Sequence, residues 1–186
     1  ELALATAVYI RLCSGNEWKT FLVMAKAKVS PNKNAMTLPR KELCAALMAA
    51  RTAVYVAKHF NISTDNVFGH TDSMTTLQWL QKSPETWKVF VRNRTRDILA
   101  LLPAIQWFHV SGKDNPADMP SRGVTSNQLR CPETLQVWFQ GPAVMSKPDW
   151  PGKVTGTFET LSANCAAAVE AKRVTVLHTT CLLYTS

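Results

Sequence analysis

The sequence lacks any long hydrophobic run: none reaches the ~18 consecutive apolar residues of a membrane-spanning helix. Residues 1–5 also lack the basic start and the small-residue cleavage site of a secretory signal peptide. The first absence excludes a membrane-spanning segment, and together they favour an intracellular, cytoplasmic location. The chain opens on alternating strand-like residues without an initiator Met, so we expect it to be a piece of a longer protein.

Cysteine is sparse and scattered. The five cysteines are odd in number, and no two of them form a CxxC pair. This pattern argues against a disulfide scaffold and against a common zinc ribbon, and it favours a reducing compartment.

Acidic residues are also few. The 186 residues include 13 Asp and Glu against 21 Lys and Arg, which gives a net charge of +8. The basic side chains gather in two groups, residues 26–41 and 88–96. Such clusters suit a phosphate backbone, although each taken alone is also typical of a solvated protein surface.

The apolar pattern predicts a mixed α/β fold. Residues 4–13 and 19–29 read as two strands joined by a turn at 14–16, which indicates a hairpin. From Pro39 to about His59, apolar residues recur at spacings of three and four, which indicates a helix. The later elements that we expect are a strand at 66–71, a helix from Ser73 to about Lys82, a helix from Ser83 to Leu102, a strand at 105–110, and a short helix from Asn115 to Gly123.

The element order β-β-α-β-α-α-β-α indicates a mixed sheet with helices packed on it. We expect this domain to cover residues 1–123. Residues 124–162 are rich in proline and tryptophan and read as an extended connector, and residues 163–186 read as a poorly defined tail with one further helix at about 163–173.

Three acids stand at the junctions between these elements: Glu42, Asp72 and Asp118. Singly, each is most simply a carboxylate near a helix start, where the helix dipole favours it by ~0.3–1 kcal/mol. Together they suggest more, because Asp72 follows a strand at the edge where ligand sites gather in α/β sheets. Converging carboxylates need a cation, and oxygen ligands select Mg²⁺ or Mn²⁺. Beside basic clusters, such a site indicates phosphoryl-transfer chemistry on nucleic acid.

Several stretches carry a resemblance to a known family. "LPRKELCAALMAAR", "HTDSMTTLQWL" and "WFHVSGKDNPADMPSRG", in this order, resemble the ribonuclease H region of BEL/Pao-type LTR retrotransposon polyproteins. "VWFQGPAVM" is similar to the segment that follows that region, so the resemblance covers roughly residues 1–152. Segments of this kind are also labelled Pao retrotransposon peptidase.

The resemblance implies a hydrolase that cleaves the RNA strand of an RNA–DNA hybrid with two Mg²⁺ (or Mn²⁺) ions. Glu42, Asp72 and Asp118 match the family's second, third and fourth metal-binding carboxylates. Its partners would be the hybrid and the reverse transcriptase and integrase regions of the same polyprotein, in a cytoplasmic particle. The residues expected to contact nucleic acid are Lys26, Lys28, Arg40, Lys41, Ser73, Arg92, Arg94 and Arg96.

The resemblance also implies a gap. The first family carboxylate lies on a strand that would precede Glu1, so we expect a ribonuclease H-like fold without its first, central strand. In that fold the sheet order is 3-2-1-4-5, and we therefore expect either a slot beside the hairpin or a forced pairing. A fragment of this kind would be inactive, or nearly so, as it stands.

Two further residue patterns bear on the site. His109 precedes Asp118 by nine positions, roughly where many ribonucleases H carry an auxiliary loop histidine, but it falls within an expected strand, where a packed histidine is the alternative. The last residues, "CLLYTS", resemble translated adapter sequence, so we expect 181–186 to lie outside the natural domain.

Three other functions were weighed. An aspartic peptidase needs a D-[TS]-G motif, which occurs nowhere in the chain. An integrase core has the acid order Asp, Asp, Glu, whereas the order here is Glu, Asp, Asp. A non-catalytic ribonuclease H-like connector that only binds nucleic acid stays the main alternative.

Overall fold

A long hairpin forms one side of the sheet. In the computed structural model, which describes residues 3–14, 17–30, 36–150 and 173–180, β1 (Ala3–Ser14) pairs antiparallel with β2 (Glu17–Val29). Alternate residues of β1 face opposite sides, as a strand requires. Val8 and Ile10 join a hydrophobic core with α1, whereas Ala7 and Tyr9 join a second core on the other face. The predicted hairpin is confirmed.

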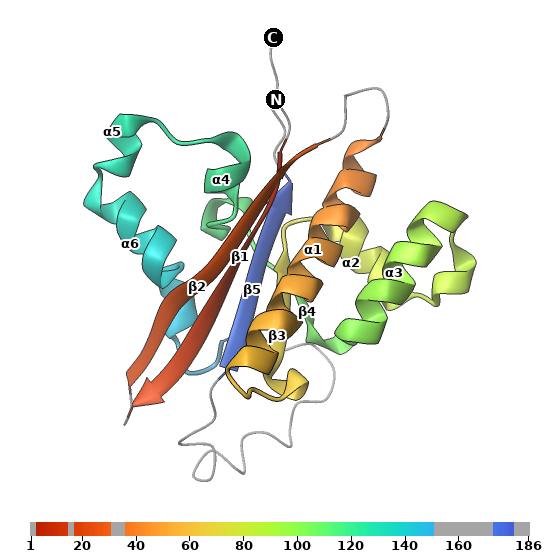
Figure 1. The fold of residues 1–186 in the computed structure, drawn as a ribbon, viewed down its shortest axis with the longest axis horizontal. Helices are drawn as coiled ribbons and strands as arrows, with labels where there is room; N and C mark the ends of the chain where they lie inside the picture. Colours follow the sequence, from red (N-terminus) through yellow and green to blue (C-terminus); the bar gives the residue numbers. More distant parts are fainter. Residues whose placement is uncertain (1–2, 15–16, 31–35, 151–172, 181–186) are drawn as a thin grey trace.

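The first face is covered by three helices (Figure 1). α1 (Leu38–His59) has Pro39 in its first turn and lies against the sheet through a stripe that is mainly alanine, which allows a close approach. α2 (Met74–Gln81) and α3 (Val89–Leu101) complete this layer. The predictions for α1 and α2 are confirmed.

The predicted start of the third helix was wrong. Pro84–Thr86 form a separate 3₁₀ turn (η2), and the α-helix begins only at Val89. Between them Trp87 is extended, and its Nε1 donates a hydrogen bond to the Trp79 carbonyl at 3.1 Å. This contact holds Trp87 out of helical conformation.

The other side of the sheet consists of two short parallel strands. β3 (Val67–Thr71) follows the 3₁₀ turn η1 (Thr64–Asn66), and β4 (Trp107–His109) pairs with it. β4 is shorter than the predicted 105–110 because the 3₁₀ turn η3 (Ala104–Gln106) precedes it. Gly69 is required here, since a Cβ at this position would lie 2.6 Å from the Trp107 ring.

The segment after β4 is mostly short helices: η4 (Gly112–Asp114), α4 (Asp118–Arg122) and α5 (Ser126–Leu129). α4 begins three residues later than predicted, because Asn115 forms a local turn in which its Oδ1 accepts a hydrogen bond from Ala117 N–H at 3.2 Å. Gly123 ends α4 with a φ of +79°, as predicted.

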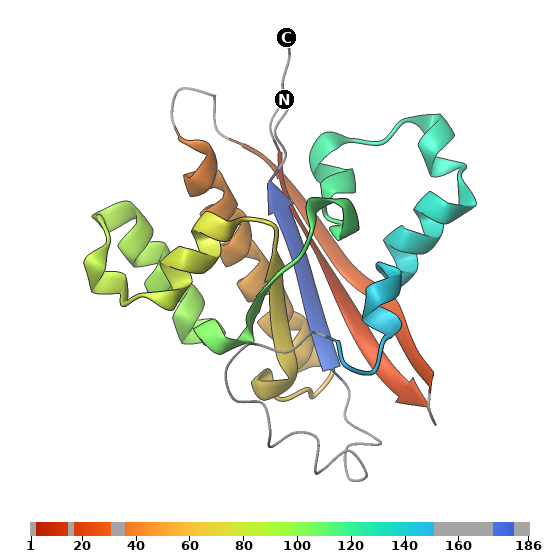
Figure 2. The same ribbon diagram turned by 180° about the vertical axis from the view of Figure 1, so that it is seen from behind.

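Residues 124–150 are not an extended connector, so that prediction was wrong. α6 (Pro132–Gln140) and the 3₁₀ turn η5 (Ala143–Ser146) lie on the second face of the sheet, as Figure 2 shows. The prolines had suggested extended backbone, but both stand where a helix tolerates proline. Pro132 occupies the first position of α6, and Pro142 immediately precedes η5.

Buried polar contacts fasten this segment to β1. The Arg11 side chain is 1% exposed and donates to the carbonyls of Met145, Lys147 and Trp150. The Tyr9 hydroxyl donates to the Trp138 carbonyl at 2.8 Å. Residues 138–150 therefore share a core with the sheet, while the domain boundary at 123 stays a prediction.

The centre of the sheet is held by β5 (Arg173–Thr180), and the strand order is β2-β1-β5-β3-β4 (Figures 1 and 2). β5 runs antiparallel to β1 and parallel to β3. The sequence led us to expect either an empty slot beside the hairpin or a forced pairing. In the structure there is no empty slot between β1 and β3 among the described residues, because β5 pairs with both strands. Residues 173–180 form a strand that the sequence did not predict, and the assignment of 163–186 as a tail stays a prediction. The helix expected at 163–173 lies outside the described residues, apart from Arg173 in β5, and so do residues 181–186.

Candidate functional site

The candidate site is built around the junction between β3 and α2. β3 ends at Thr71 and α2 begins at Met74, so Asp72 and Ser73 form the connection. Ser73 is the N-cap of α2: its Oγ accepts a hydrogen bond from Thr76 N–H at 3.1 Å. Its own N–H donates to Thr71 Oγ1 at 3.0 Å. These contacts fix the backbone on which Asp72 stands.

Glu42 reaches this junction from α1. The Ser73 hydroxyl donates a hydrogen bond to Glu42 Oε2 at 2.5 Å, so one serine connects the acid to the cap of α2. Burial raises the pKa of Glu42, the hydrogen bond from Ser73 opposes that rise, and the negative charge of Asp72 adds to it. The structure thus brings two of the three predicted acids together.

Glu42 is the fifth residue of α1, in its second turn. The first turn of α1 contains no acid. The simple explanation of Glu42 as a dipole-stabilising first-turn acid is therefore weakened, because that effect falls off within the first turn.

Asp118 follows the η4 turn and is the first residue of α4. Its Oδ2 forms a 2.8 Å ion pair with Nη2 of Arg122, which lies one helical turn later, and the Asp118 side chain is 15% exposed. Gly112 stands near Asp72, since a Cβ on Gly112 would lie 3.7 Å from Asp72 Oδ2, and it also lines a hollow with Asp118 and Arg122.

The three acids do not form a complete metal site. Within the described ranges, no three Asp, Glu, His or Cys side chains lie close enough together to hold an ion. Glu42 and Asp72 form a pair, whereas Asp118 is bound by Arg122. β5, which passes beside Thr71, contains no Asp or Glu. As long as Asp118 is paired with Arg122, the three acids are not arranged to hold Mg²⁺ or Mn²⁺.

His109 lies at the exposed end of β4, in register with Thr71. It lines a hollow with Asp114, Lys147 and Asp149, on the face of the sheet where Trp150 packs. His70 also borders this hollow but is buried, with its ring stacked between Phe108 and Trp150. An auxiliary catalytic role for His109 stays a prediction.

The first group of expected nucleic-acid contacts is divided. Lys26 and Lys28 are exposed on β2, and the Arg40 guanidinium lies 4.9 Å from the Phe90 ring. Lys41, however, is 2% exposed, and Ser73 is buried. Ser73 is used by Glu42 and Thr76 in this conformation, and the contact of Lys41 and Ser73 with nucleic acid stays a prediction.

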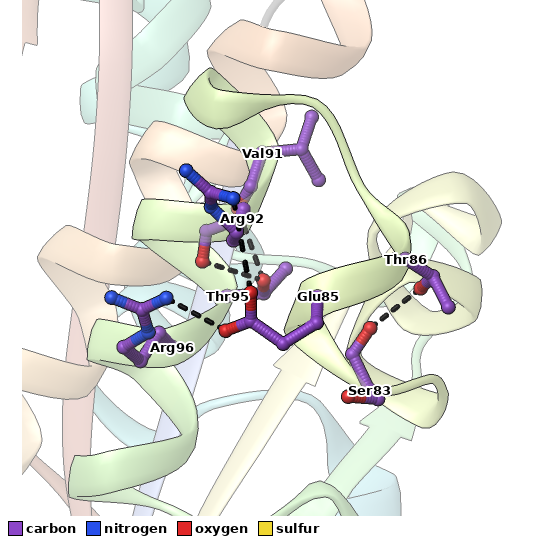
Figure 3. Close-up of polar contacts among 7 residues, drawn as sticks. All are labelled: Ser83, Glu85, Thr86, Val91, Arg92, Thr95 and Arg96. Carbon is purple, nitrogen blue, oxygen red and sulfur yellow. Dashed lines mark hydrogen bonds and ion pairs between the residues drawn. The ribbon is translucent and has the colours of Figure 1, made fainter.

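The arginines of the second basic group, on α3, each contact a neighbouring side chain of the protein. Glu85 of η2 points toward α3, where it forms ion pairs with Arg96 Nη2 at 2.7 Å and Arg92 Nη1 at 3.8 Å (Figure 3). The Arg94 guanidinium lies 3.4 Å from the centre of the Phe90 ring, and its Nε donates to Cys44 Sγ at 3.2 Å.

Two of the residues that organise the site region were missed from the sequence. Glu85 received no role from the sequence, yet it forms ion pairs with Arg92 and Arg96, seven and eleven residues later. Arg11 gave no signal, because its partners lie at 145–150.

A comparison with protein families finds a match to the first part of the chain. Residues 1–73 match the profile described as Pao retrotransposon-like RNaseH-like domain, which confirms the resemblance for this region. The match includes Glu42 and Asp72 and ends at Ser73. No curated protein and no solved structure matched the chain. None of the helices that the structure describes is long and apolar enough to cross a membrane.

Proposed function

We propose, on the premise that residues 1–73 are a Pao retrotransposon-like RNaseH-like domain, that the chain is a ribonuclease H-type hydrolase acting on the RNA strand of RNA–DNA hybrids. One observation supports this most: Glu42 and Asp72, from α1 and from the end of β3, share an environment organised by Ser73. We also propose that β5 takes the place of the central first strand of that fold.

Glu42, Asp72 and Asp118 are the proposed ligands of Mg²⁺ or Mn²⁺, which would supply charge stabilisation at the reacting phosphate. We expect weak nuclease activity, because Asp118 would have to leave Arg122 before it could join Glu42 and Asp72. Ser73 would orient Glu42, and Lys26 and Lys28 would hold the nucleic-acid backbone. In the parent polyprotein, the proposed neighbours are the reverse transcriptase and integrase regions.

The test is a cleavage assay with the whole chain and a hybrid labelled on the RNA strand, in Mn²⁺ and in Mg²⁺. We expect slow, cation-dependent cleavage that is lost in Asp72→Asn and Glu42→Gln. Asp97→Asn is the matched control, since Asp97 is an exposed carboxylate paired with Arg51 on the surface. Full cleavage by Asp72→Asn would overturn the assignment.

A second function, nucleic-acid binding without catalysis, is favoured by the ion pair between Asp118 and Arg122. In that case the chain would bind the hybrid with a salt-dependent affinity, and no cation would produce cleavage. Cleavage that Asp72→Asn abolishes would exclude this alternative.

A further inference from the structure

The strand at the centre of the sheet joins its two halves. β1 and β3 each pair with β5 and not with each other: Leu4–Arg11 align with Thr180–Arg173, and Val67–Thr71 align with Val174–His178. β5 therefore fills a slot between two halves of the sheet that meet only through it.

The slot is lined by backbone groups that need a partner. α1 lies against β5 on one face, and α4 contacts it on the other. Blue β5 runs between red β1 and the yellow-green β3 in both ribbon views (Figures 1 and 2). Without a strand here, the inner N–H and C=O groups of β1 and β3 would be unpaired beneath helices, which a folded protein does not tolerate.

The two ends of the covalent connection to β5 lie close together. Both ends of the intervening stretch, residues 151–172, come to the same residue: Arg11 donates a hydrogen bond to the Trp150 carbonyl at 2.9 Å and lies in register with Arg173. β5 pairs with β1 and β3 through backbone hydrogen bonds. A strand entering from another segment could make the same ladder.

We propose that the slot between β1 and β3 is a strand-acceptor site, in which a separate polypeptide strand can replace β5. Its occupant is an extended segment of about eight residues, the length of β5, antiparallel to β1 and parallel to β3. β5 supplies the chemical pattern, since five of its eight residues are β-branched Val or Thr, which suit a central strand. This inference goes beyond the proposed nuclease function and does not depend on it.

The experiment starts from the whole chain with a specific protease site placed within residues 151–172. After cleavage, the C-terminal piece should stay with the body in size-exclusion chromatography and native mass spectrometry. The cut complex is then unfolded and refolded with an excess of a fluorescent peptide of residues 173–180. The cut is made first because a tethered strand has a high effective concentration and would outcompete the free peptide. Refolding then lets the peptide and the cleaved piece compete for the same slot.

We expect the labelled peptide to replace the C-terminal piece and to protect β1 and β3 amides from hydrogen exchange. A Val176→Pro peptide should be incorporated at least about tenfold less, because proline lacks the N–H of a central strand. Val176 aligns with Val8 on one side and with Gly69 on the other, so the change falls within both paired stretches.

Two results would overturn the proposal. One is a body that stays folded after the C-terminal piece has left, because the slot would then need no strand. The other is equal incorporation of the two peptides, or of neither. The assay contains no nucleic acid and no metal, so its failure is distinguishable from failure of the proposed nuclease function.

Discussion

The Ser73 hydroxyl connects two elements at once: it donates to Glu42 Oε2 at 2.5 Å and accepts from Thr76 N–H at 3.1 Å. Ser73→Ala should therefore lower the free energy of unfolding by about 0.5–2 kcal/mol, the usual cost of a lost N-cap. Urea denaturation measures this. Ser73→Thr keeps a hydroxyl and should recover most of the loss, whereas equal stability of Ser73→Ala and the parent chain would contradict the role of the cap.

Glu42 should make stability depend on pH. Its pKa is raised in the folded state, so between 4.5 and that raised value the folded chain binds more protons than the unfolded chain. The contribution of Glu42 to stability therefore falls as pH rises through this window. Urea midpoints of the parent chain and of Glu42→Gln are compared from pH 4 to pH 8. The midpoint of the parent chain should fall relative to that of Glu42→Gln as the pH rises. A pH-independent difference would contradict the raised pKa.

Arg122 should compete with cations for Asp118, because its guanidinium lies 2.8 Å from the carboxylate. Arg122→Gln should increase Mn²⁺ affinity about fivefold, since a unit charge a few ångströms away is worth ~1 kcal/mol in water. Isothermal titration calorimetry measures the affinity. Arg51→Gln removes the same charge from the exposed pair with Asp97 and should leave Mn²⁺ binding unchanged. The same increase in both variants would indicate a general effect of net charge.

Glu85 should weaken nucleic-acid binding, because it neutralises Arg92 and Arg96. Glu85→Gln should raise the affinity for an RNA–DNA hybrid and steepen its salt dependence by ~1–2 in log–log slope, at ~0.9 per added phosphate contact. Fluorescence anisotropy across a salt series measures both. Glu17→Gln, beside Lys19 at 3.7 Å, is the charge-matched control. Identical slopes for the two variants would show that the arginines on α3 do not contact the phosphates.

Arg11 should hold residues 143–150 on the sheet. Arg11→Met leaves three carbonyls without their donor and should cost about 3 kcal/mol or more, whereas Tyr9→Phe loses one hydrogen bond and should cost ~0.5–1.5 kcal/mol. Hydrogen exchange should show faster opening of residues 143–150 in Arg11→Met. Unchanged exchange there would mean that other contacts anchor this segment.

The parts of the fold that the sequence predicts are those set by local patterns. The hairpin, α1 and the Ser73 cap follow from alternation, helical periodicity and capping chemistry. The pairing of Glu42 with Asp72 was also anticipated, because it depends on where a strand ends.

The remaining features depend on contacts between distant residues. The break before α3 arises from the Trp87–Trp79 hydrogen bond, and the docking of residues 138–150 arises from Arg11 and Tyr9. Lys41 is 2% exposed although its charge suggested a place at the surface. The ion pair between Asp118 and Arg122 follows an i,i+4 spacing. The spacing alone does not show whether Asp118 binds Arg122 or a metal cation.

The position of β5 also has a consequence for synthesis on the ribosome. β1 is synthesised well before its inner partner β5, since Leu4 pairs with Thr180. Until then the nascent hairpin presents an unpaired apolar edge, a form prone to joining strands of other chains. Such long-range pairing also slows folding. A chaperone that shields β1 until β5 has been made should therefore raise the yield of folded chain.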